Sequence, residues 1–86
     1  MSKKVKPILN IKINTPNETL WEGEAQSVSS ENSQGVFDIL PLHANMVTLI
    51  QDKPIIIRTT EKDRRYTFKS AVLYTHNSSV EIYGDI

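Results

Sequence analysis

The sequence predicts an all-β fold: a small sandwich or flattened barrel of about nine to ten short, mostly antiparallel strands. Short apolar or alternating stretches recur at intervals of about eight to ten residues, and polar turns separate them. No window carries the apolar spacing of three to four residues that an amphipathic helix needs. At 86 residues the chain has the length of one domain, and we expect residues 1–86 to form a single sandwich.

The first third of the chain predicts three strands. Residues 9–14 alternate between apolar and polar side chains, as a strand with one buried face does. Residues 20–22 form a short apolar piece before Gly23, and residues 25–29 alternate again. Residues 30–35 are polar and predict a loop.

The middle of the chain carries the clearest pattern. Residues 36–40 are mainly apolar and lie between Gly35 and Pro41, which predicts a strand with a punctuating residue at each end. Because Pro41 cannot donate a hydrogen bond to a sheet, this strand must end there or lie at an edge. A second apolar run over residues 46–50 follows and predicts the next strand.

The last third predicts four more strands. Residues 55–60 are almost all β-branched, which favours a strand over a helix. Residues 61–64 are charged and predict a solvated hairpin tip. Residues 65–69, 71–75 and 80–83 complete the set of strands.

Composition excludes several classes of protein. Ten basic and ten acidic side chains give a formal net charge of zero, whereas a nucleic-acid-binding protein would carry a basic excess. The absence of cysteine excludes disulfides and thiolate metal sites. No apolar run reaches the roughly 18–20 residues that span a bilayer. Low net charge suits a subunit that lives within an assembly.

The corner before the second apolar run contains His43 and Asn45, whose side chains are the best candidates for chemistry or contacts. His43 with Asp38 suggests a catalytic dyad, but no serine lies in a recognisable nucleophile motif. His43 with His76 lacks further ligands for a metal. We therefore predict no catalytic, cofactor-binding or metal site, and interpret His43 as a residue with a structural hydrogen bond or an interface contact.

Trp21 has two open interpretations. Tryptophan is over-represented at interface hot spots, so Trp21 could anchor a partner. It could equally close one end of the sandwich core.

Three stretches, taken with Asp85 near the end of the chain, match a known family in order and spacing. They are residues 10–16, residues 20–25 and residues 35–44, where Pro41 and His43 stand at the family's distances from Gly35. On these residues the chain resembles the N-terminal β-sandwich domain of the epsilon subunit of F-type ATP synthases, called delta in the mitochondrial enzyme.

The chain departs from the family pattern at three places. Asp38 and Leu42 stand where the family has glycines, and Ser70-Ala71 replaces a glycine pair. Leucine tolerates the left-handed backbone region poorly. We therefore predict that Leu42 does not adopt a positive φ and that the backbone there differs from that of the family.

The resemblance implies a non-catalytic rotor subunit of a proton- or sodium-coupled rotary ATPase. Such a subunit binds the gamma subunit, couples rotation at the foot of the central stalk and contacts the c-ring, with indirect links to the catalytic alpha and beta subunits. It is peripheral, on the cytoplasmic side of the membrane. By position Gly35 and Val36 face the ring and His43 lies near gamma; Asn45 and Trp21 are further candidates for the interface.

Two alternatives stay open. The family usually adds a C-terminal helical hairpin, which these 86 residues do not contain, so we expect neither the nucleotide binding nor the regulation that the hairpin provides. The first alternative is therefore a subunit of a divergent F-type-like motor. The other is a free-standing all-β adaptor that binds a protein or small ligand. A rotor subunit should expose an unusually apolar face, whereas an adaptor should have a concave pocket with converging polar groups.

Overall fold

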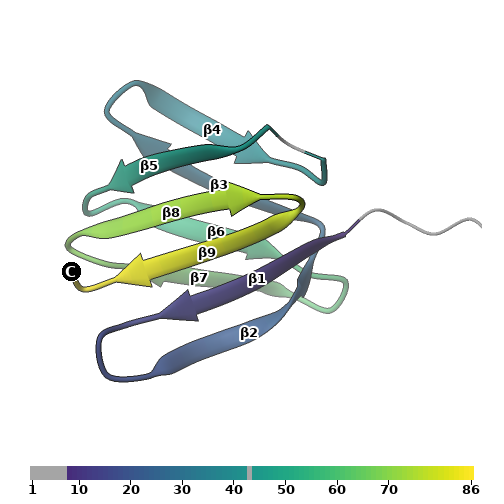
Figure 1. Cartoon of the computed structure of the whole chain (residues 1–86), viewed down its shortest axis with the longest axis horizontal. Helices are drawn as coiled ribbons and strands as arrows, with labels where there is room; N and C mark the ends of the chain where they lie inside the picture. Colours follow the sequence, from purple (N-terminus) through teal and green to yellow (C-terminus); the bar gives the residue numbers. More distant parts are fainter. Residues whose placement is uncertain (1–7, 43) are drawn as a thin grey trace, which may run out of the picture.

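The computed structural model describes residues 8–42 and 44–86, which form two facing β-sheets (Figure 1). This confirms the predicted all-β sandwich of short strands. The strands are β1 Leu9–Asn14, β2 Thr19–Ala25, β3 Ser27–Asn32, β4 Gly35–Ile39, β5 Met46–Ile50, β6 Pro54–Arg58, β7 Asp63–Thr67, β8 Ala71–His76 and β9 Ser79–Gly84.

The five-stranded sheet has the order β2-β1-β9-β8-β5, and the four-stranded sheet has the order β4-β3-β6-β7. Among the described strands, all neighbours are antiparallel except β1 and β9. The parallel β1–β9 pair joins the first and last strands at the centre of the larger sheet. The chain changes sheet after β2, β4, β5 and β7, so each sheet is completed by segments far apart in sequence.

The core lies between the sheets and is built almost entirely from aliphatic side chains. Successive residues of a strand point to opposite faces, so every second residue of β1 and β9 is buried. Burial of each such side chain stabilises the fold by about 1.5–3 kcal/mol before the entropy of ordering is counted. The buried apolar residues are Leu9, Ile11, Ile13, Ala25, Val28, Ile39, Ile50, Ile55, Ile57, Phe68, Ala71, Leu73, Val80 and Ile82.

One edge of the sandwich is closed by aromatic packing between β2 and β7. The guanidinium of Arg64 lies 4.8 Å from the ring centroid of Trp21, and Arg64 Nε donates to the Tyr66 hydroxyl at 3.1 Å. Gly23 leaves the room that the indole needs, since a Cβ there would lie 2.6 Å from the Trp21 ring. Trp21 is half-buried and packs against the core.

β3 extends further along the chain than the strand that the sequence predicted over residues 25–29. The polar residues 30–32 belong to β3, although the sequence predicted a loop there. Ser30 is buried, and its hydroxyl donates to the carbonyl of Pro54 at 2.9 Å. Residues 30–32 pair with β4, whereas β6 pairs with residues 27–29. This tertiary pairing outweighs the low strand propensity of the side chains of β3.

The prediction for Leu42 was wrong, because its φ is 68°, in the left-handed region. The side chain is 84% exposed, so nothing packs against it and forces another conformation. The N–H of Leu42 donates to Ser78 Oγ at 3.1 Å, which holds this turn against the β8–β9 connection. The left-handed backbone at Leu42 therefore lowers the stability of the fold by about 1–2 kcal/mol, the usual cost for an L-residue.

Candidate partner-binding site

The structure places the candidate interface residues in three separate regions. Gly35 and Val36 are the first residues of β4. Asn45 lies beyond the other end of β4, just before β5. Trp21 lies on β2, at the opposite edge, which is at the bottom of Figure 1. His43 lies outside the described residues. The candidate residues in the described part of the chain therefore do not form a single site.

Gly35 sets the direction in which β4 leaves the β3–β4 turn. Its φ is 124°, a conformation that L side chains rarely adopt. The turn is held on its other side by Asn32, whose Oδ1 accepts the N–H of Gln34 at 2.9 Å. Asn32 Nδ2 also donates to Thr48 Oγ1 at 3.0 Å, which ties this end of the smaller sheet to β5.

The outward side of β4 and the turn after it carry the most exposed apolar side chains of this region. Val36 is 78% exposed, Leu40 56% and Leu42 84%. Pro41 predicted that this strand ends there or lies at an edge, and both hold: β4 ends at Ile39 and pairs only with β3. We call Val36, Leu40 and Leu42 the β4 flank. It is a strip of apolar side chains that a monomer would not need to expose.

Asp38 interrupts this strip with a polar network on the outer face of the four-stranded sheet. The hydroxyl of Ser29 donates to Asp38 Oδ1, and Arg58 Nη1 donates to Ser29 Oγ at 2.8 Å. Arg58 Nε lies 4.0 Å from Asp63 Oδ2. Asp38 lies within β4 and has no positive φ, so the backbone at this position does not require a glycine. The aspartate that stands in place of the family's glycine forms a hydrogen bond with Ser29.

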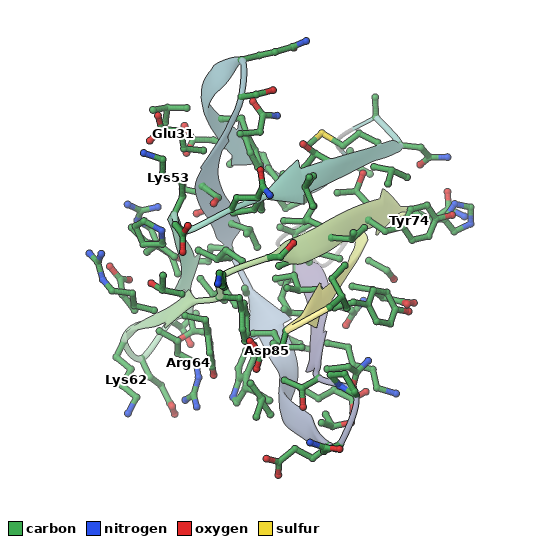
Figure 2. All side chains as sticks on the ribbon, turned by 90° about the vertical axis from the view of Figure 1, so that its left-hand side faces the viewer. Glu31, Lys53, Lys62, Arg64, Tyr74 and Asp85 are labelled. Atoms are coloured by element: carbon green, nitrogen blue, oxygen red, sulfur yellow. The ribbon has the colours of Figure 1, made fainter. Side chains whose placement is uncertain are left out.

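The smaller sheet bears one more ion pair near the β3–β4 turn. Lys53 Nζ and Glu31 Oε1 lie 3.9 Å apart, and Figure 2 shows the two side chains on the same side of the molecule. Both side chains are nearly half-exposed, so the pair contributes at most about 1 kcal/mol to stability.

A second exposed apolar region lies on the outer face of the five-stranded sheet. Val47 is 67% exposed and Leu49 48%, and Tyr74 and Tyr83 are exposed beside them. Figure 2 shows Tyr74 directed outward from β8, on the side away from Glu31 and Lys53. The sequence predicted these strands but not this surface, because an apolar residue in a short strand gives no sign of which sheet face it occupies.

The described residues offer little chemistry beyond contact. No group of three or more histidine, aspartate or glutamate side chains in residues 8–42 and 44–86 is placed to hold a metal ion. Over the same residues, no helix is long and apolar enough to cross a membrane. What this part of the chain presents is a pair of apolar surfaces separated by polar rows.

Comparison with known proteins identifies the family. Residues 8–86 match the family described as ATP synthase, Delta/Epsilon chain, beta-sandwich domain. The chain belongs to this family. The match covers every described strand, so the predicted resemblance is confirmed.

Curated relatives in the family are named ATP synthase epsilon chain. That of Leptospira borgpetersenii serovar Hardjo-bovis is 30% identical over 77 residues, which is 90% of this chain and 61% of the relative. That of Helicobacter pylori strain 26695 is 30% identical over 78 residues, which is 91% of this chain and 63% of the relative. This chain thus spans about three-fifths of the length of these epsilon chains.

Solved structures show the same fold. A chain in the Tetrahymena thermophila mitochondrial ATP synthase central stalk and c-ring superposes with a TM-score of 0.76 and 14% identity, covering 96% of this chain and 66% of that one. A chain of the Euglena gracilis mitochondrial ATP synthase gives a TM-score of 0.83 at 10% identity, covering 98% and 54%. At such identities the likeness concerns the fold.

Proposed function

We propose that this epsilon-type chain is a non-catalytic rotor subunit of an F-type or F-type-like rotary ATPase. It binds the gamma subunit at the foot of the central stalk and couples rotation there to the c-ring. The catalytic alpha and beta subunits are reached through gamma. The chain is a peripheral component on the cytoplasmic side of the membrane.

The observation that carries the proposal is the family match over residues 8–86. The names of the relatives and the central-stalk setting of one structural neighbour support it. The surface adds physical support, because a subunit that lives in an assembly needs an apolar docking area, and the β4 flank offers one.

Within this proposal the two ends of β4 have different partners. Gly35 and Val36 lie at the turn end, and we assign them to the c-ring contact. Leu42 and Asn45 lie at the other end, on either side of His43, and we assign them to gamma. Trp21 is assigned to the core edge, because it packs there against Arg64.

The absence of native cysteine gives a direct test by single-cysteine crosslinking. In the complex purified from its own cells, Val36→Cys should crosslink to a ring subunit and Leu42→Cys to gamma. Leu20→Cys is the matched control, since Leu20 is exposed on β2, at the other edge of the sandwich, and should crosslink to neither. Mass spectrometry of the products identifies each partner.

Two outcomes would reject the proposal. One is purification of the chain without gamma-like, alpha-like and beta-like subunits, as a free-standing adaptor would behave. The other is equal crosslinking of the Leu20 control, which would mean that the products reflect collision and not a docked surface.

A further inference from the structure

The connection between β4 and β5, which carries Leu42 and Asn45, is anchored by two hydroxyl groups from another hairpin. Both groups come from the end of β8 and the turn after it, which Figure 1 shows at the same end of the sandwich as this connection. The anchoring residues, Thr75 and Ser78, lie 29 to 36 residues further along the chain than the groups they bind. The folded topology is what brings them to the proposed docking segment.

Thr75 holds the β5 side of this connection. It is 3% exposed and lies on the inward face of β8. Its hydroxyl donates to the carbonyl of Ala44 at 3.0 Å and accepts the N–H of Met46 at 2.9 Å. One side chain therefore fixes the backbone on both sides of Asn45. A valine of nearly the same shape would leave both backbone groups without this partner.

Ser78 holds the β4 side. Its hydroxyl accepts the N–H of Leu42 at 3.1 Å, and its carbonyl accepts the N–H of Asn10 at 2.9 Å. The second bond ties the β8–β9 turn to β1 in the larger sheet. The hydroxyl that binds Leu42 is therefore presented from a fixed part of the fold.

The backbone of Ser78 shows that this position would suit glycine better than serine. Asn77 and Ser78 form a two-residue turn between the paired residues His76 and Ser79, with φ values of 48° and 63°. A turn with two positive φ values prefers asparagine first and glycine second. A glycine would avoid the strain but would lack the acceptor for Leu42, which is itself strained. Two strained residues joined by one hydrogen bond are typical of a segment whose conformation serves a function.

We propose that Thr75 and Ser78 are positioning residues for the gamma contact, because their hydroxyls hold the β4–β5 connection in the conformation that presents Leu42 and Asn45. A segment that is already ordered loses less entropy on binding, so preorganisation raises the affinity without a new contact. Neither hydroxyl needs to touch gamma. The inference rests on the proposed rotor function and adds to it the residues that set the docking geometry.

The test measures two quantities for each variant of the full chain. One is the urea midpoint, and the other is the affinity for the gamma-containing complex from its own cells, stripped of this subunit. Ser78→Gly should leave the midpoint near that of the native chain, because relief of the strained φ offsets the lost hydrogen bond, yet weaken the affinity about twofold to tenfold. Ser78→Ala keeps the strain, so it should lower the midpoint and weaken the affinity by the same factor.

Variants of Thr75 should separate the two quantities in the opposite direction. Thr75→Val should weaken the affinity about twofold to tenfold, as loss of the hydroxyl does at Ser78. Thr75→Ser should bind as the native chain does, although loss of a buried methyl group lowers its midpoint. Affinity would then follow the hydroxyl and not the stability, which a purely structural role would not produce.

Thr59→Val is the matched control. The Thr59 hydroxyl donates to the carbonyl of Lys62 at 2.6 Å and accepts the N–H groups of Glu61 and Lys62, so it holds the β6–β7 turn in a similar way. This turn lies outside the proposed docking segment. The variant should therefore keep the affinity within about twofold of the native value.

The inference is overturned if the affinities of the variants simply follow their urea midpoints, or if Thr59→Val weakens binding as much as Thr75→Val does. Amide hydrogen exchange in the free chain tests the positioning without a partner. Ser78→Gly should speed exchange at Leu42 and not at Ile82 in the core, and unchanged exchange at Leu42 would also overturn the inference. Failure of the native chain to bind the stripped complex would instead reject the rotor function, and the docking role with it.

Discussion

At the scale of single residues, Leu42 shows how a turn can override a conformational preference. A leucine with a φ of 68° is strained, and its exposed side chain contributes no packing in return. The family's glycine at this place would adopt the same backbone freely.

Replacing Leu42 tests this strain. At ordinary exposed strand positions glycine is less stable than alanine by about 0.5–1 kcal/mol. We expect the reverse here: Leu42→Gly should be more stable than Leu42→Ala by about 1 kcal/mol, because only glycine relieves the left-handed backbone. Urea unfolding of both variants measures the difference.

Val36 provides the control, since it is similarly exposed but lies in β4 without a positive φ. Val36→Gly should be less stable than Val36→Ala. If glycine is also the less stable residue at position 42, the strain argument is wrong.

Tyr83 gives a prediction about pH. Its hydrogen bond to Glu81, aided by burial and the negative charge of that carboxylate, raises the pKa of Tyr83 above the ordinary value of 10.0. The unfolded chain therefore loses this proton first as the pH rises. Stability from the interaction is fully present below pH 10 and is lost as the pH rises through the raised pKa.

The variant Glu81→Gln should move the titration of Tyr83 back towards its ordinary pKa. Tyrosinate absorbance, measured with Tyr66 and Tyr74 replaced by phenylalanine, follows the remaining ring. Glu22→Gln is the control, because it removes a carboxylate of the same face without a bond to Tyr83. An unchanged midpoint in Glu81→Gln would contradict the stated cause.

At the scale of elements, the two edges of the sandwich are treated differently. The β2–β7 edge is closed by Trp21 and Arg64, whereas the β4 flank leaves its apolar side chains in solvent. An edge that is closed by its own side chains serves stability, and one that stays apolar and open is available to a partner.

A double-mutant cycle on Trp21→Leu and Arg64→Met measures the closure. We expect a coupling of about 0.5–1 kcal/mol in the free energy of unfolding, which is typical of a partly exposed cation–π contact. The cycle of Trp21→Leu with Arg65→Met is the control, since Arg65 is exposed and its strand neighbours point to the other face. Equal coupling in both cycles would show that Arg64 has no specific role.

Local patterns predicted most of the elements and little of their pairing. Alternation over residues 9–14 predicts β1 because burial of one face imposes a period of two. Nothing in that stretch predicts its parallel pairing with β9, since hydrogen-bonding partners are backbone groups common to all residues. The family motif gave Val36 as an interface candidate, which stays a prediction. The apolar face around Tyr74 follows only from the register of three strands.

At the scale of the whole molecule, three of the seven strand pairings among the described residues join segments that are distant in sequence. The β1–β9 pair spans nearly the full chain, and β5–β8 and β3–β6 span long intervals. Closing such long loops lowers the conformational entropy of the chain before the native contacts that offset this loss have formed. Sandwiches of this kind fold slowly compared with helical bundles of equal size.

We therefore expect refolding of the free chain in about a millisecond to a second. Stopped-flow dilution from urea, followed by the fluorescence of Trp21, the single tryptophan, measures the rate. The variant Val80→Ala removes buried methyl groups from β9 and should mainly lower the yield of folded chain, because the core contacts of β9 close the larger sheet. Complete refolding within microseconds would contradict the topological argument.

The place of β9 has a consequence for the living cell. The ribosome makes β9 after every other strand, yet β9 lies at the centre of the larger sheet, between β1 and β8. Until β9 emerges, the pairs β1–β2 and β5–β8 cannot be joined into one sheet, and their apolar faces are incompletely covered. Nascent chains of this protein must therefore be shielded during translation, and a stalled ribosome would display an incomplete sheet that chaperones can recognise.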